Sequence, residues 1–306
     1  MVLTTIASGV LMFVVGIVGL LPLMLVIFEI LFLRQSLTPF RYFILSKLIA
    51  DGFEIFLVMI VLVSTQLVFG EWMPKCYRPV VGYLALALQY SSFYTSVGMT
   101  INRFFTIMYP LKCRKWFRPK AIIVMISICW LFAWAHNLIY LIPGCEFTFD
   151  FTIIRFVFSE ERCADNLSLY QDLIYNIVLS ILVTTIDIFS LAKLRRMARR
   201  TAHVSIKTRR EKPWFLQATI NSALYLLMLV CFHTSDFFDG TNIRFFLAVI
   251  SWELYLSSAP YCIIILQKEF QTPFRNVWKR AVHRKEISIL HVSTELKWKS
   301  HSRPIA

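Results

Sequence analysis

The chain has 306 residues, of which 58% are hydrophobic and only 16% are charged, and its mean hydropathy is +0.64. This composition excludes an ordinary soluble domain, and apolar stretches of about 20 residues or more recur, which is typical of a membrane protein with several spans. The formal net charge of +14 would also suit a nucleic-acid-binding protein. However, the Lys and Arg residues gather in alternate loops, so we expect them to follow a membrane surface and expect no nucleic-acid partner.

Seven apolar stretches predict seven transmembrane helices. They do not alternate with a period of two, which favours helices over a β-barrel. We therefore predict an all-α membrane fold, with a seven-transmembrane helix bundle over residues 1–266 and a cytosolic amphipathic helix and tail over residues 267–306. In chain order the predicted spans are about Ile6–Leu33, Tyr42–Val68, Val80–Met108, Ala121–Ile142, Leu173–Leu194, Trp214–Phe232 and Ile243–Leu266.

The basic residues also predict the orientation in the membrane. Most of them lie in the loops after the first, third and fifth helices and in the tail, so the positive-inside rule places the amino terminus outside and the carboxyl terminus in the cytosol. We expect a multi-pass protein of the plasma membrane. Asn166 begins an Asn-Leu-Ser glycosylation sequon on the predicted outer side. After the seventh helix, Phe270, Phe274 and Trp278 fall on one helical face, which predicts an amphipathic helix on the inner leaflet.

Three cysteines lie on the predicted outer side, where disulfides persist. We expect Cys76, at the mouth of the third helix, to pair with Cys163, which is close to the fifth helix; Cys145 is the alternative partner. Between Cys145 and Cys163, residues 146–152 alternate strictly between polar and apolar types, and Phe156 and Phe158 repeat the pattern, which predicts a β-hairpin. The sequence leaves open whether this hairpin caps a cavity or only packs on the rim of the bundle.

The third predicted helix carries a stripe of polar residues that ends at Arg103, a charged residue that is unfavourable inside a membrane. An arginine at the centre of a membrane costs ~2.5–3.5 kcal/mol, and less near the interface, so Arg103 at the cytosolic end needs a role. The functional interpretation is that the outer part of this helix lines a ligand pocket; the alternative is hydrogen bonding between packed helices. The stripe consists of Gln89, Ser92, Ser96, Thr100 and Arg103. The candidate pocket residues are Gln89, Ser92, Phe93 and Trp252.

Other ionisable groups lie inside the predicted helices. Asp51 either pairs with Lys47 one turn away or forms a switch site shared with the third and seventh helices. Glu253 lies nearly mid-membrane beside Trp252 and is a candidate ligand contact or proton-sensitive lock. Asp187 is expected to pair with Lys193 or Arg103.

The sequence shows no motif that is typical of a metal site or an enzyme active site. His136 and His233 stand alone, and we interpret them as packed, hydrogen-bonded groups. We find no zinc spacing, glycine-rich phosphate loop or nucleophile motif. We therefore expect no metal, no cofactor and no enzymatic activity.

Several motifs, taken in order, resemble a known family over about residues 6–280. They are the Asn102-Arg103-Phe104 triplet, the stretch from Pro143-Gly144-Cys145 through Phe156-Val157-Phe158 to Cys163, Asp187, the Phe215-Leu216-Gln217 segment and Lys268-Glu269-Phe270. Together with seven helices they resemble the rhodopsin-like G-protein-coupled receptors, and most closely the nematode chemoreceptors called serpentine receptor class x.

The resemblance implies a role for particular residues of this chain. Arg103 and its neighbour Asn102 correspond to the motif whose arginine contacts a heterotrimeric G protein, with Asn102 in place of the usual acid. Tyr109, Asp187 and Pro260 complete the implied switch, although Ala259 precedes Pro260 where the family usually has asparagine. The implied function is a receptor for an extracellular ligand, which is an unknown small molecule or peptide.

Two other classes of function remain open at this point. A multi-span transporter or channel for a small solute would need a continuous polar pathway and helices broken in mid-membrane, and neither is evident in the sequence. The other alternative is a membrane scaffold without a ligand.

Overall fold

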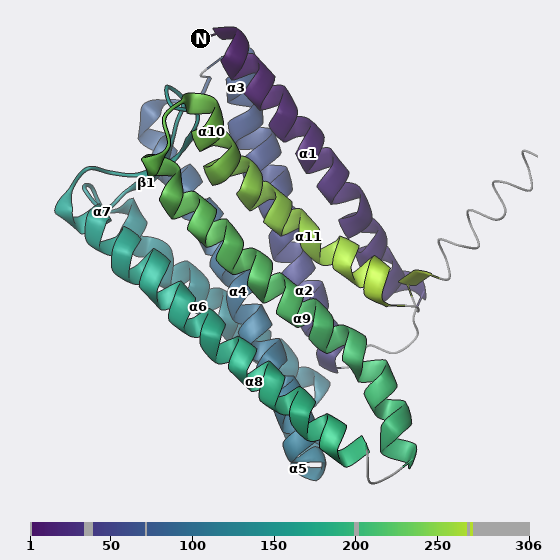
Figure 1. Cartoon of the computed structure of the whole chain (residues 1–306). Coiled ribbons are helices and arrows are strands. Elements are labelled where there is room, and N and C mark those ends of the chain that lie inside the picture. Colours follow the sequence, from purple (N-terminus) through teal and green to yellow (C-terminus); the bar gives the residue numbers. More distant parts are fainter. Residues whose placement is uncertain (1, 34–38, 71, 199–201, 268–269, 272–306) are drawn as a thin grey trace, which may run out of the picture.

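The computed structural model describes residues 2–33, 39–70, 72–198, 202–267 and 270–271. Long helices run side by side and form an elongated bundle (Figure 1). The α-helices are α1 Val2–Phe28, α2 Pro39–Phe53, α3 Thr65–Phe69, α4 Arg78–Met108, α5 Pro110–Trp116, α6 Pro119–Asn137, α7 Arg162–Asn166, α8 Tyr175–Ala198, α9 Ala202–Thr234, α10 Thr241–Phe245 and α11 Ser251–Leu266. Wider π-type turns cover Glu29–Leu33, Glu54–Ser64, Leu167–Ile174 and Phe246–Ile250, and short 3-10 turns cover Lys75–Tyr77, Leu138–Leu141 and Ser235–Phe237.

Six helical stretches in the described part of the chain are long and apolar enough to cross a membrane. They are Thr5–Phe32, Phe40–Phe69, Pro119–Leu141, Arg162–Met197, Pro213–Phe237 and Thr241–Leu266. The seventh long helix is α4, whose 31 residues carry the polar stripe and are mostly buried. α4 packs against α2, α6 and α8, which explains why its composition is less apolar than that of its neighbours. The predicted all-α membrane fold is therefore confirmed.

Two helices extend further than the sequence predicted. The helical path into α8 begins at Arg162, and α9 begins at Ala202, although we expected spans from Leu173 and Trp214. A hydropathy pattern detects only the apolar part of a helix, so polar helical turns beyond that part escape it. The predicted amphipathic helix after the seventh span lies outside the described residues, apart from Phe270 and Gln271.

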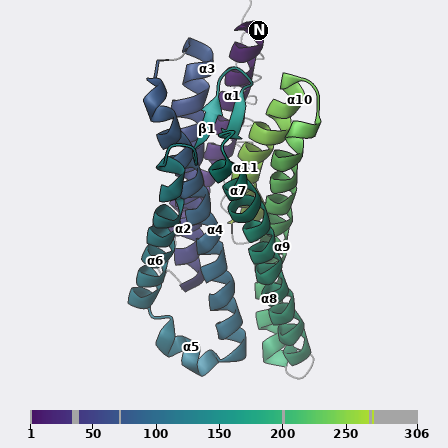
Figure 2. The same ribbon diagram turned by 90° about the vertical axis from the view of Figure 1, so that its left-hand side faces the viewer.

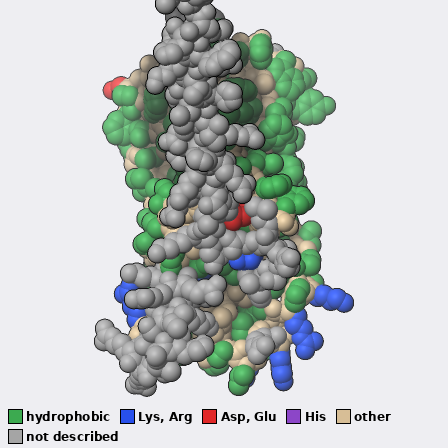
Figure 3. All heavy atoms as spheres, turned by 90° about the vertical axis from the view of Figure 1, so that its right-hand side faces the viewer, with side chains coloured by type: hydrophobic (Ala, Val, Ile, Leu, Met, Phe, Trp, Pro, Cys, Tyr) green, Lys and Arg blue, Asp and Glu red, His purple; other side chains and the backbone are tan. Residues whose placement is uncertain are grey.

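The outside of the bundle is apolar along most of its length. Large hydrophobic side chains such as Leu21, Leu131 and Val178 are more than half exposed, as expected for helices that face lipid. Figure 3 shows hydrophobic side chains along both flanks, with Lys and Arg gathered toward one end of the visible face. We call that end the α5 end because α5 lies there, and the opposite end, which carries α3, α10 and β1, the hairpin end (Figures 1 and 2).

The predicted β-hairpin is present. β1 (Phe147–Asp150) pairs antiparallel with β2 (Arg155–Phe158), so that Phe147 faces Phe158 and Asp150 faces Arg155. Phe147, Phe149 and Phe156 are at most 2% exposed and belong to the main hydrophobic core. The hairpin thus enters the bundle between α4 and α11, rather than lying on the rim (Figure 2).

A glycine permits this close approach. A Cβ atom added to Gly82 of α4 would overlap the backbone carbonyl of Phe147. Residue 82 must therefore lack a side chain for the hairpin to reach its depth.

The expected disulfide between Cys76 and Cys163 is wrong. Cys163 is bonded to Cys145, with a Cα–Cα distance of 4.9 Å, and Cys76 is an exposed free thiol. The hairpin explains this pairing, because its ladder continues through a hydrogen bond from Ser159 N to Glu146 O of 3.0 Å. The two ends of the 145–163 segment are thereby brought together, whereas Cys76 lies before the start of α4.

Candidate functional site

At the α5 end of the bundle, Arg103 of α4 forms an ion pair with Asp187 of α8. The distance from Nη1 to Oδ2 is 3.6 Å, and the two side chains are only 5% and 3% exposed. Thr100, one turn before Arg103, donates a hydrogen bond of 3.1 Å from Oγ1 to the same carboxylate oxygen. We expected Asp187 to pair with Lys193 or Arg103, and in the structure it pairs with Arg103.

Two aromatic rings enclose the guanidinium group of Arg103. It lies 4.5 Å from the ring centroid of Phe40 in α2 and 5.4 Å from that of Phe215 in α9. Such cation–π contacts stabilise a desolvated arginine by up to about 2 kcal/mol. Arg103 therefore contacts three other helices, and its position depends on how α2, α8 and α9 are arranged.

The remaining residues of the proposed switch occupy different surroundings. Asn102 is buried, and its Nδ2 has no hydrogen-bond partner among the described residues. Tyr109 directly follows α4 and is half exposed, and the ammonium of Lys112 lies 5.8 Å from the centroid of the Tyr109 ring. Pro260 is buried within α11. The structure does not bring these three residues into contact with the Arg103–Asp187 pair by any hydrogen bond that it shows.

A second buried ion pair lies closer to the middle of the bundle. Lys47 donates from Nζ to Asp51 Oδ2 at 2.7 Å and to Ser92 Oγ at 2.9 Å. The same ammonium lies 5.6 Å from the ring centroid of Tyr255 in α11. The expected Lys47–Asp51 pair is present, and it joins α2 to α4. Ser92 is turned toward Lys47 rather than toward a ligand pocket.

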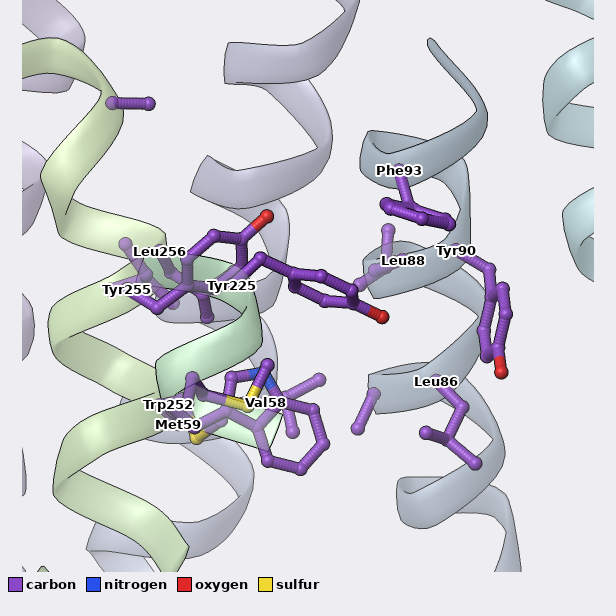
Figure 4. Packing of buried hydrophobic residues seen from close by; sticks show 14 of the residues in the cluster. Val58, Met59, Leu86, Leu88, Tyr90, Phe93, Tyr225, Trp252, Tyr255 and Leu256 are labelled. Carbon is purple, nitrogen blue, oxygen red and sulfur yellow. The ribbon is translucent and has the colours of Figure 1, made fainter. Parts of the chain in front are cut away.

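Aromatic side chains fill the bundle between this pair and the hairpin. Phe93 of α4 stacks on Tyr225 of α9, with ring centroids 4.8 Å apart. The rings of Tyr225 and Tyr255 lie in the space between α11 and α4 (Figure 4). Trp252 is 3% exposed and packs on Phe156 of the hairpin, with centroids 5.2 Å apart. Gln89 is also buried, and its Oε1 has no hydrogen-bond partner in the described region.

Glu253 is buried on the side of α11 that faces α1. A Cβ atom added to Gly16 of α1 would lie 2.8 Å from Glu253 Oε1, and Glu253 is 0% exposed. Neither carboxylate oxygen has a hydrogen-bond partner among the described residues. Glu253 therefore lies in the contact between α1 and α11.

Sequence reasoning missed a polar cluster at the hairpin end. His233 of α9 contacts Asp172 before α8, with 3.0 Å between Nε2 and Oδ2. Asn176 donates to Asp172 Oδ1 at 3.3 Å and to the hydroxyl of Tyr90 at 3.0 Å. The available signal was Asp172 and Asn176 on one helical face of an apolar stretch. His233, the partner of Asp172, lies 61 residues further along the chain, so no local pattern connects the two residues.

A second missed contact ties the hairpin to the 3-10 turn that follows α9. Arg155 of β2 donates to Ser235 Oγ at 3.0 Å and forms an ion pair with Asp236. The end of α9 is thus joined to the segment that precedes α8, and the 3-10 turn that follows α9 is joined to the hairpin. Within the described residues, no group of three or more His, Cys, Asp or Glu side chains could hold a metal ion.

The fold is shared with a known receptor. The structure of squid rhodopsin superposes with a TM-score of 0.72 at 14% sequence identity, and the match covers 92% of this chain and 87% of the rhodopsin chain. At this identity the likeness shows the fold alone, which is that of a rhodopsin-like seven-helix membrane protein.

The sequence comparisons identify the family. The family described as "Serpentine type 7TM GPCR chemoreceptor Srx" matches residues 13–264, and the chain belongs to this family. It is also 30% identical over 132 residues to somatostatin receptor type 2 of Mus musculus and to that of Sus scrofa. These matches cover 43% of this chain and 34% of each receptor, so the chain spans about a third of the length of the curated relatives.

Proposed function

We propose that this chain is a chemosensory receptor that binds a ligand at the hairpin end and activates a heterotrimeric G protein at the α5 end. Membership of the chemoreceptor family supports this general class. The observation that carries the proposal is the buried pair between Arg103 and Asp187. A buried arginine held by one carboxylate and two rings is a group that a small helix movement releases or retains.

The charge distribution supports an orientation with the α5 end in the cytosol. Exposed basic side chains gather at that end, while acidic side chains are common at the hairpin end. The positive-inside rule then favours a plasma-membrane receptor with its amino terminus outside. The basic side chains are Lys112, Lys115, Arg118, Lys120, Lys193, Arg195 and Arg196. Asn166 is exposed at the hairpin end, where a glycan would be accessible.

The ligand site of this proposal lies beneath the hairpin. Gln89 and Phe93 of α4 and Trp252 of α11 lie in or beside the aromatic cluster of the core. Phe156 covers Trp252 directly, so a ligand that reaches Trp252 has to replace that contact. The ligand is an unidentified small molecule or peptide, and binding would loosen the hairpin that Arg155 ties to the 3-10 turn after α9.

Ligand-independent nucleotide exchange tests the role of Arg103 without a known ligand. Asp187→Asn removes the charge that holds the guanidinium, and we expect membranes with this variant to raise exchange on a panel of purified heterotrimeric G proteins several-fold. Arg103→Ala added to Asp187→Asn should return exchange to the level of membranes without receptor, because the contacting group is then absent.

Arg162→Ala is the matched control for the loss of an arginine. Arg162 is exposed at the hairpin end, so adding this substitution to Asp187→Asn should leave the raised exchange intact. Equal exchange from Asp187→Asn and from the double variant with Arg103→Ala would overturn the proposed coupling role of Arg103.

A further inference from the structure

A small cavity with both polar and apolar side chains in its lining lies where α2, α4, α8, α9 and α11 meet. Its volume is about 30 Å³. The cavity lies between the two buried ion pairs, because Lys47 of one pair and Asp187 of the other both line it. The polar side chains that the argument uses are Lys47, Ser96, Thr100, Ser180, Asp187 and Asn221.

Several of these polar groups have no partner within the described protein. Ser180 Oγ, Asp187 Oδ1 and Asn221 Oδ1 are buried and form no hydrogen bond with the described residues. Ser180 and Asp187 are each only 2% exposed. Buried polar groups in folded proteins are almost always hydrogen-bonded, to ordered water where no protein group is available. Three such atoms around one cavity therefore point to a bound molecule.

The size and charge of the cavity define that molecule. A site for an organic ligand usually has a volume of about 300–1,000 Å³, which excludes such a ligand here. One water needs roughly 10–15 Å³ of cavity volume and two to four polar partners, so this cavity accommodates about two waters. A metal cation is disfavoured because the positively charged residue Lys47 is part of the lining.

We propose that this cavity is a hydration site, in which water molecules bind Ser180, Asn221 and the free oxygen of Asp187 and connect the Lys47–Asp51 pair to the Arg103–Asp187 pair. Asp187 has one oxygen for Arg103 and Thr100 and a second oxygen for water. The bound water completes the hydrogen bonds of α8 and α9 and joins the mid-bundle pair to the pair at the α5 end. The hydration site itself does not depend on the proposed receptor function, and only its effect on signalling does.

Radiolytic hydroxyl-radical labelling of the detergent-solubilised full chain tests this site. The radicals form from water and react before they diffuse far, so a buried methionine is oxidised only where water lies beside it. Met99 lines the cavity and is 5% exposed, whereas Met228 is equally buried at 4% but is not part of the lining. We expect Met99 to be oxidised at least fivefold faster than Met228 in the unmodified chain.

A filled cavity provides the second measurement. Ser180→Val replaces the hydroxyl and adds a methyl group beside the cavity, and it should reduce the oxidation of Met99 at least twofold. Ser190→Val is the matched control, since Ser190 is a fully buried serine of α8 that does not line the cavity. It should leave the oxidation of Met99 unchanged.

Two results would overturn the hydration site. Equal oxidation of Met99 and Met228 in the unmodified chain would mean that the cavity is dry, and this comparison needs no variant to fold. Rapid oxidation of Met99 that persists in Ser180→Val would mean that its label comes from bulk solvent. Neither result bears on nucleotide exchange, so the proposed receptor function would stand or fall separately.

Discussion

Replacing Lys47 with methionine removes the ammonium of a buried ion pair while keeping an unbranched side chain of similar length. Lys47 and Asp51 are 2.7 Å apart and only 7% and 0% exposed. At an effective dielectric constant of 20, the attraction between two unit charges at this distance is about 6 kcal/mol. Desolvation costs several kcal/mol for each ion, so the intact pair adds little net stability, whereas removal of one partner leaves a buried charge and costs about 3–5 kcal/mol.

The two single variants and the double variant should differ in their free energies of unfolding in a definite order. Lys47→Met leaves the carboxylate of Asp51 without its ammonium, and Asp51→Asn removes the charged hydrogen-bond acceptor of the ammonium, which keeps Ser92 and the Tyr255 ring as neighbours. The double variant leaves neither charge, so its free energy of unfolding should exceed that of either single variant. We therefore expect a coupling energy of about 2–4 kcal/mol between the two positions, beyond what additive substitutions would give.

Chemical denaturation of the purified variants in one detergent measures these free energies. Ser92→Ala serves as a control, because it removes one hydrogen bond of Lys47 and should cost only about 1 kcal/mol. The reasoning would be refuted if each single variant had the same free energy of unfolding as the unmodified chain within experimental error. It would also be refuted if the double variant lost as much free energy of unfolding as the two single variants together.

Further predictions concern the hairpin and its disulfide. Gly82→Ala should destabilise the bundle by about 1–3 kcal/mol, because its Cβ atom would overlap the Phe147 carbonyl; Gly52→Ala, whose nearest contact is a flexible leucine side chain, is the control in the same denaturation assay. Cys76→Ser should leave the Cys145–Cys163 bond intact, and a thiol reagent should label Cys76 in the unmodified folded chain; a Cys76 that reacts only after reduction would contradict the pairing. Cys145→Ser should lower stability by about 3 kcal/mol, since it opens a loop with a sequence separation of 18 residues.

Much of the fold follows from the sequence because the membrane imposes simple rules. The apolar stretches give the helices since every backbone group in lipid must be satisfied internally. The alternation over residues 146–152, repeated by Phe156 and Phe158, predicts the hairpin because successive side chains of a strand point to opposite faces. Both patterns are local, and both are confirmed in the structure.

The parts that sequence reasoning missed depend on long-range geometry. Which cysteine pairs with Cys163 depends on how the hairpin closes, and no spacing rule contains that information. The contact between Asp172 and His233 joins residues 61 positions apart. The direction of the Glu253 side chain depends on Gly16, which allows α1 to approach α11 closely.

The polar stripe of α4 depends both on a local sequence pattern and on long-range geometry. Helical periodicity places Ser92, Thr100 and Arg103 on one face, but it does not say which helix each of them meets. In the structure Ser92 meets Lys47 of α2, whereas Thr100 and Arg103 meet Asp187 of α8. The two buried pairs therefore depend on different helix contacts, although residues of α4 contact both.

The two buried ion pairs respond differently to a displacement of α8. The pair in α2 is intrahelical, since Lys47 and Asp51 are four residues apart with 2.7 Å between Nζ and Oδ2. The pair of Arg103 and Asp187 crosses from α4 to α8 and is longer, at 3.6 Å. A displacement of α8 relative to α4 stretches only the second pair, because both members of the first move with α2. Such a displacement would therefore lengthen the pair at the α5 end and leave the geometry of the mid-bundle pair unchanged.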